Sequence, residues 1–342
     1  MTTHARSRLA LGLSLVVACS SLAFFFRQDA PAAPTMMTAA TKFLAGLSPE
    51  QRKSAAFGFD DPHREKWYFT PQQANKQSTR KGLRLDGLND AQKAAAYELL
   101  KSGLSATGFE QAKTIVSLET LLAEFENNGG NVRNPQWYFV SIFGEPSATG
   151  AWGWRFEGHH LSVNVTLDKG EVVSATPLLF ATNPAEVRTG AKKGLRPLAD
   201  IEDTAKDLIA TLTDEQNATA KQTKLFGDIQ EGRPDANVGA PVGIPAAKLA
   251  AAQKDQLRKL IATYAGRFAP GIAKEELKRI DDAGADKLFF AYGHDAAKPG
   301  KPTTYRIQGP TFVVEFLNVQ ADALGNPANH IHSGWRRLPK DF

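Results

Sequence analysis

Cysteine is almost absent from this 342-residue chain, since the only one, Cys19, lies close to the N-terminus. The rest of the chain therefore has no disulfide, no thiol nucleophile and no thiolate ligand for a metal. Basic side chains outnumber acidic ones only slightly, by 41 to 36, and no dense run of Lys and Arg is present. Nucleic-acid-binding surfaces are usually strongly basic, so we expect no nucleic-acid partner.

Several catalytic signatures are missing as well. The sequence contains no Gly-x-Ser-x-Gly elbow, no Walker loop, no Gly-x-Gly-x-x-Gly fingerprint and no His-Glu-x-x-His helix. Each of these motifs is a local arrangement that holds a nucleophile, a phosphate, a dinucleotide or a zinc ion. The chemistries that depend on these motifs can therefore be set aside.

The first 41 residues are typical of an export signal or membrane anchor with a small-residue linker. Basic residues at positions 4–8 precede an apolar run from Leu9 to Phe26, and an Ala-, Pro- and Thr-rich stretch covers positions 29–41. This order predicts export to the cell envelope and attachment to the membrane through the N-terminus. Cys19 follows Val16-Val17-Ala18, which resembles a lipobox and predicts lipidation of Cys19. An uncleaved anchor and a simple cleaved signal are the alternatives.

The remaining sequence repeats itself. Residues 82–88 match residues 243–249 at a separation of 161, and residues 154–161 match residues 305–312 at a separation of 151. In both halves a helical pattern precedes segments in which apolar and polar residues alternate, as strands with one buried face do. We therefore predict an α+β fold built by internal duplication, each half having helices followed by an antiparallel sheet. The halves are residues 42–190 and 191–342, packed against each other.

Histidines gather near the ends of the predicted strands. His330 and His332 are two residues apart, so in a strand both side chains point to one face. His160 lies on the polar face of the strand that begins at Leu161. If the polar faces of the two halves meet, these three imidazoles form the ligand set expected for zinc or copper. We expect no part in ligation for His159, which lies in a turn, or for His294, at a strand end.

Other polar residues on the same predicted faces complete the hypothetical site. Glu157 or Glu315 is expected to act as a fourth ligand or as the base that activates a metal-bound water. Arg155 and Arg306 occupy equivalent positions in the two halves and, with Asn164, are candidates to bind an anionic substrate. The alternative for these arginines is a structural role in which each braces its hairpin.

Three functions are compatible with this pattern. The leading hypothesis is an exported, membrane-tethered protein with a transition-metal site, acting as a metal-dependent hydrolase. The second is a non-catalytic envelope protein that binds a small anionic or carbohydrate ligand. The third is a metal-free hydrolase in which Glu157 and His160 form an acid–base pair.

Several blocks of the sequence resemble a known family. They are residues 66–71, 152–164 (Trp-Gly-Trp-Arg-Phe-Glu-Gly-His-His-Leu-Ser-Val-Asn), 183–187, 305–310 and 329–333 (Asn-His-Ile-His-Ser). Together they are similar to the domain of unknown function 3500 family over roughly residues 44–342. The resemblance implies no particular activity, but its blocks contain the histidines named above. The chain departs from the family pattern at Arg337, where an aspartate is usual, and at Thr303-Thr304, where a histidine is common.

Overall fold

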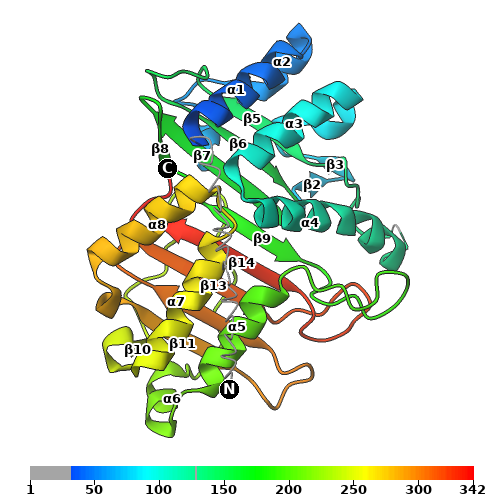
Figure 1. The fold of residues 1–342 in the computed structure, drawn as a ribbon. Helices are drawn as coiled ribbons and strands as arrows, with labels where there is room; N and C mark the ends of the chain where they lie inside the picture. Colours follow the sequence, from blue (N-terminus) through cyan, green and yellow to red (C-terminus); the bar gives the residue numbers. More distant parts are fainter. Residues whose placement is uncertain (1–31, 128) are drawn as a thin grey trace, which may run out of the picture.

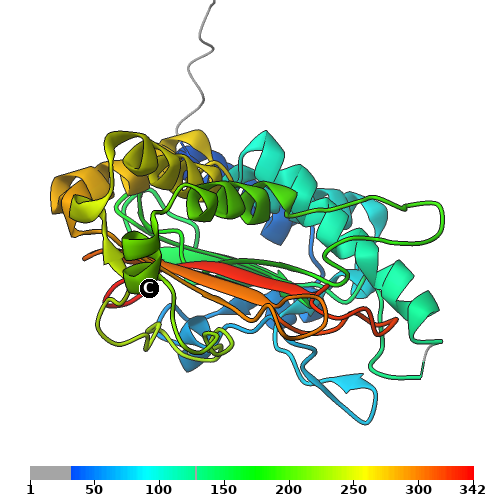
Figure 2. The same cartoon turned by 90° about the horizontal axis from the view of Figure 1, so that it is seen from below.

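The computed structural model describes residues 32–127 and 129–342, which form eight α-helices and a large mixed sheet of 12 strands (Figure 1). The helices cover one face of this sheet, and long loops cover the other (Figure 2). The predicted combination of helices and sheet is therefore correct.

Helices precede strands in both parts of the described chain. The earlier part contains α1 (Ala32–Ala45), α2 (Pro49–Ala55), α3 (Asp90–Gly103), α4 (Ala106–Phe125), β5 (Phe139–Phe143), β6 (Trp152–Gly158), β7 (Leu161–Asp168), β8 (Glu171–Ser174) and β9 (Leu178–Thr182). The later part contains α5 (Ala199–Ala210), α6 (Asp214–Ala220), α7 (Ala251–Ala265), α8 (Pro270–Ala283), β11 (Phe289–His294), β12 (Thr303–Gln308), β13 (Phe312–Asn318) and β14 (Ile331–Arg337).

The sheet is continuous across both parts. Its order is β1-β5-β6-β7-β9-β14-β13-β12-β11-β10, with β4 on β5 and β8 on β7. The strands at its two ends have two residues each: β1 (Ala56–Phe57) and β4 (Leu83–Arg84) at one end, and β10 (Ile244–Pro245) at the other. All pairs are antiparallel except β1 with β5, so the expected antiparallel sheets are joined into one mixed sheet. A separate ribbon pairs β2 (Gln73–Ala74) with β3 (Gln77–Ser78).

The fold begins earlier than the sequence indicated. Residues 32–41 were assigned to a linker, but they form most of α1, in which Met36, Ala40 and Phe43 are completely buried. These residues recur at helical spacing, and small side chains between them allow close packing on α3. Cys19 and the other leader residues up to position 31 lie outside the described residues. None of the described helices is long and apolar enough to cross a membrane.

Two similar hydrogen-bond arrangements secure the helices of the two parts. The side chains of Gln51 and Gln92 hydrogen-bond each other, and Gln92 also donates to the carbonyl of Gly46 at 2.7 Å. Gln216 and Gln253 are paired in the same way, and Gln253 donates to a backbone carbonyl at 2.7 Å as well. Between these arrangements, the junction of α3 with α4 forms an antiparallel bridge to the junction of α7 with α8, from Leu104 to Phe268.

Candidate metal centre

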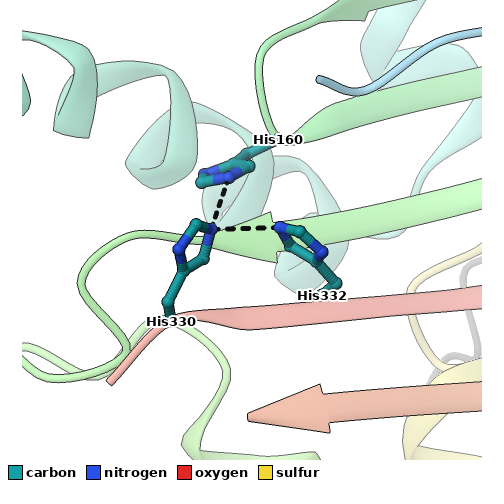
Figure 3. Close-up of side chains that lie close together, drawn as sticks. All are labelled: His160, His330 and His332. Carbon is teal, nitrogen blue, oxygen red and sulfur yellow. Dashed lines mark hydrogen bonds between the residues drawn. The ribbon is translucent and has the colours of Figure 1, made fainter. Parts of the chain in front are cut away.

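Three imidazoles meet where the ends of β6, β7, β9 and β14 come together (Figure 3). The Nε2 atom of His330 lies 2.9 Å from Nε2 of His160 and 3.0 Å from Nε2 of His332. Ligand atoms of the three residues lie within 4.8 Å of one another, close enough to bind a metal ion. The predicted convergence of these histidines is therefore present, with one residue from the earlier part and two from the later part.

Local backbone geometry directs the three rings to one point. His160 ends the tight turn between β6 and β7 with a φ of 65°, and its N–H donates to the carbonyl of Phe69 at 2.8 Å. Its carbonyl accepts the N–H of Ala181 at 2.8 Å, and Ala181 in turn pairs with His332 in the β9–β14 ladder. This ladder places His160 next to β14. His330 and His332 reach the same side because they alternate with Ile331.

One ring has its second nitrogen held by an acceptor. Asp228 lies in the loop before β10, and its carboxylate oxygens are 2.8 and 3.0 Å from Nδ1 of His332. A carboxylate in this position accepts the Nδ1 proton and leaves the Nε2 lone pair for a metal ion. The His332 ring is therefore held in the orientation of a metal-binding histidine.

Burial disfavours protonation of two of these imidazoles. It lowers the pKa of His330 to about 2, and the neighbouring His332 adds to the effect. Burial also lowers the pKa of His160 well below 6.5, and His159 and His330 add to the effect. Although burial raises the pKa of the Asp228 carboxyl, its hydrogen bond with His332 holds that pKa below 3.8. Unprotonated imidazole is the form that binds a metal ion.

A second polar group lies behind His160. The ring of His159 stacks on that of His160 with centroids 3.6 Å apart, and its Nδ1 is 2.5 Å from a carboxylate oxygen of Glu119 on α4. Arg133 contacts the His159 ring and forms an ion pair with Glu126 at 2.9 Å. His159 does lie in the turn, as expected, but it also fixes the position of the His160 ring.

The two glutamates expected to take part in the chemistry are elsewhere. Glu157 forms an ion pair with Arg80 at 3.3 Å and accepts the N–H of Tyr68 at 2.9 Å. Glu315 forms an ion pair with Arg306 at 2.9 Å, and burial raises its pKa. Among the described residues, neither carboxylate belongs to the histidine group. Both carboxylates, expected to bind the metal or to act as a base beside it, instead form ion pairs with arginines on the loop-covered face of the sheet.

The side chains predicted to bind an anion also form hydrogen bonds within the fold. Arg155 is buried and donates to Asn164 at 2.6 Å and to two loop carbonyls, those of Lys66 and Arg64. Arg306 donates to the carbonyl of Val238 at 3.1 Å and to Glu315. These contacts support the alternative structural role, in which each arginine braces a loop against the sheet.

Sequence reasoning missed Asp228 and Glu119, the carboxylates that contact His332 and His159. Asp228 is separated from His332 by 104 positions, and Glu119 from His159 by 40. No short motif encodes either pair. His294 lies outside the centre, with its Nδ1 3.0 Å from the hydroxyl of Thr303.

The chain matches the model of a protein family. A family model described as "Protein of unknown function (DUF3500)" matches residues 29–342, so the chain belongs to this family. No curated protein and no solved structure matches the chain.

Proposed function

We propose that this member of the family binds a zinc or copper ion through His160, His330 and His332. In tetrahedral zinc sites the Zn–N bonds of about 2.0–2.1 Å place two ligand nitrogens roughly 3.3 Å apart. The separations of 2.9 and 3.0 Å between the Nε2 atoms are close to this spacing. The ligand atoms of all three residues lie within 4.8 Å of one another, so the rings of His160 and His332 approach each other when a tetrahedral ion is bound.

One observation carries the proposal. A ring nitrogen of imidazole has either one hydrogen or one lone pair, so it forms one in-plane hydrogen bond. Nε2 of His330 faces two other Nε2 atoms, and a single proton cannot satisfy both contacts. The contact of Asp228 with Nδ1 moreover favours a lone pair on Nε2 of His332. A cation among the three lone pairs resolves this conflict.

The chemistry that we propose for this centre is hydrolysis. Three protein ligands leave one coordination position open, and a zinc ion in such a site supplies a hydroxide nucleophile near neutral pH. His159 and Asp228 hold two of the ligand rings in place. Arg155, Arg306, Glu157 and Glu315 have no part in this proposal, because other contacts occupy them.

A second candidate is metal-dependent binding without catalysis. Each carboxylate near the rings is already engaged: Asp228 contacts His332, and Glu119 contacts His159. Neither carboxylate is therefore free to act as a separate acid or base beside the proposed ion, which favours a binding protein for a small anionic ligand in the envelope. Turnover of activated carboxylic and phosphoric esters by the zinc-loaded protein, abolished by chelator, distinguishes the hydrolase from this candidate.

Metal analysis tests the ligand set. The purified full-length chain is exposed to zinc or copper, desalted and analysed by mass spectrometry for metal per chain. We expect about one ion in the wild type and in the control His294→Ala, and almost none in the double variant His330→Ala/His332→Ala. Equal metal content in the wild type and the double variant would falsify the proposal.

We further propose that the protein is exported and tethered to the envelope membrane through its N-terminus. The order of basic, apolar and small residues in positions 4–41 supports export, and Val16-Val17-Ala18-Cys19 supports lipidation. Mass spectrometry of the membrane fraction tests this proposal. A lipid-modified Cys19 at the new N-terminus is expected, whereas an unprocessed chain indicates an uncleaved anchor and a soluble cleaved chain indicates a simple signal.

We also propose that the two halves arose by duplication. The similar side-chain pairs Gln51–Gln92 and Gln216–Gln253 support this, as does the backbone bridge from Leu104 to Phe268. Backbone hydrogen bonds also occur at corresponding places in the two parts, from Ala181 to His160 and from Leu338 to Thr311. Superposition of the Cα atoms of β5, β6, β7 and β9 on those of β11, β12, β13 and β14 tests the relationship. Failure of the helices to coincide after that superposition would remove the proposal.

A further inference from the structure

A short basic loop stands next to the histidine centre. This loop, residues 188–194 (Arg-Thr-Gly-Ala-Lys-Lys-Gly), is exposed along its whole length. It contains three cationic side chains, Arg188, Lys192 and Lys193, and no acidic residue occurs between positions 187 and 199. It is therefore a locally positive protrusion.

Hydrogen bonds tie the base of the loop to the histidine centre. The N–H groups of Ala185 and Glu186 donate to Asn329 at 2.7 and 2.8 Å, and the Asn329 side chain donates to the carbonyl of Glu186 at 2.9 Å. Asn329 immediately precedes His330. The segment itself follows directly from β9, whose Ala181 pairs with His332. The loop and the proposed ligands therefore share one supporting element.

The shape of the loop is also fixed. Two backbone hydrogen bonds between Val187 and the 194–195 segment close it, at 2.7 and 3.0 Å. Lys192 at its tip donates to the hydroxyl of Ser117 on α4, two residues before the Glu119 that contacts His159. Figure 1 shows this green segment beside the end of α4 and the red segment that leads into β14. The loop is thus anchored to both sides of the histidine centre.

Two of its cations are available for a ligand. The side chains of Arg188 and Lys193 have no hydrogen-bond or ion-pair partner among the described residues, whereas nearby Arg196 is occupied by Glu202 and Asp203. Exposed cations without partners raise the local concentration of anions over roughly a Debye length, about 8–10 Å.

We infer that the ligand of the histidine centre is an anion, a carboxylate or a phosphate ester, which the basic loop attracts through Arg188 and Lys193. This inference rests on the proposed metal site and names the class of its ligand. The cations that attract the anion are those of this loop. Arg155 and Arg306 do not take this role, because their guanidinium groups donate hydrogen bonds to other side chains inside the fold.

Binding of inorganic phosphate to the cobalt-loaded full-length protein tests the inference, with the visible absorption of cobalt as the readout. In the double variant Arg188→Glu/Lys193→Glu we expect phosphate binding to weaken about five-fold at low ionic strength, and the difference to shrink as salt is added. The control Lys274→Glu changes an exposed lysine on α8 and is expected to bind phosphate as the wild type does. Equal phosphate affinity in the double variant and the wild type overturns the inference while leaving the metal site intact.

A second measurement distinguishes failure of the inference about the basic loop from failure of the proposed metal site. If cobalt does not bind, calorimetric titration of the metal-free protein with phosphate still compares the same variants. Weaker binding by the double variant supports the role of the loop. Binding that does not depend on the loop charges, or no phosphate binding at all, overturns it.

Discussion

Asp228 shows how a single residue can set the properties of the centre. Its carboxylate oxygens lie 2.8 and 3.0 Å from the Nδ1 atom of His332, and this contact determines which nitrogen of the ring carries the proton. Carboxylates in this position orient a ligand ring and raise its basicity. Asp228 is therefore a positioning residue, distinct from the three residues proposed to contact the ion.

The Asp228→Asn variant should bind zinc about 10- to 100-fold more weakly than the wild type, because the amide holds the His332 ring less strongly. Competition with a chromophoric chelator measures this affinity. Asp235→Asn is a matched control in the same loop, since Asp235 pairs with Arg233 on the surface. Unchanged zinc affinity in Asp228→Asn would show that the ring is oriented by other contacts.

His63 predicts a pH dependence that does not involve the metal. Burial, with a smaller contribution from the charge of Arg155, lowers its pKa to about 4 from 6.5. The ring lies between Phe57 and Phe143, where the charged form is poorly solvated. Between these two values the unfolded chain binds more protons than the folded chain, so stability is present above pH 6.5 and is lost as the pH falls toward 4.

In the presence of chelator, the contribution of His63 to the free energy of unfolding should fall by up to about 3 kcal/mol from pH 7 to pH 4. The His63→Phe variant should show a shallower pH dependence in urea titrations. At pH 8 the imidazole of the wild type is neutral, like the phenyl ring of the variant. The difference between their free energies of unfolding at this pH therefore gives the baseline difference in packing. Parallel curves for the two proteins over this range would contradict the assignment.

At the level of single residues, the three histidines of the centre were predictable and their partners were not. Strand parity placed His330 and His332 on one face, and the predicted duplicated sheet placed His160 on the polar face of the earlier half. Asp228 and Glu119 belong to a loop and a helix far away in sequence, so their contacts depend on the tertiary fold. Glu157 and Glu315 were placed on the correct strands, but parity does not reveal that loops cover that face.

The helix junctions show how closely the elements approach one another. Gly108, in the first turn of α4, packs against the backbone of the α7–α8 junction. A Cβ atom at this position would lie 2.3 Å from the carbonyl oxygen of Arg267 and 3.0 Å from its Cα. Backbone atoms cannot move aside as a flexible side chain can, so the separation of the two helix pairs depends on glycine here.

The Gly108→Ala variant should therefore lose about 2–4 kcal/mol of stability, although alanine favours the helix itself by about 1 kcal/mol. Urea denaturation measures the loss. Gly271→Ala is the matched control, because Gly271 lies in the first turn of α8 and a Cβ atom there meets nothing within 4 Å. A loss of the same size in both variants would indicate that the contact with Arg267 is unimportant.

Elements were easier to predict than their boundaries and pairing. The alternation of Leu161, Val163 and Val165 with polar residues correctly located β7, and the helices preceded the strands as expected. The pairing of β9 with β14 has no signal in either strand, because a register between distant segments depends on the whole fold. Helix α1 was missed because its small residues resemble those of a linker.

For the whole molecule, the position of the histidine centre has a thermodynamic consequence. His160 belongs to the earlier half, and His330 and His332 belong to the later half, across the β9–β14 seam. An ion bound to all three connects the halves and binds the folded chain in preference to the unfolded chain.

Zinc at about 100 times its dissociation constant should raise the free energy of unfolding by about 2.7 kcal/mol. Urea titrations with zinc and with chelator measure the difference. The double variant His330→Ala/His332→Ala should show no such increase, and the control His294→Ala should show the full one. Stabilisation of only one of two separate unfolding transitions would mean that the ion does not connect the halves.

The short strands at both ends of the large sheet have a consequence for how molecules of this protein meet. A long exposed edge strand presents a row of free N–H and C=O groups on which another chain can add a strand. Here β1, β4 and β10 have two residues each, so the two ends of the described sheet offer little template for sheet extension. Strand addition at these two ends is therefore disfavoured when the protein is concentrated.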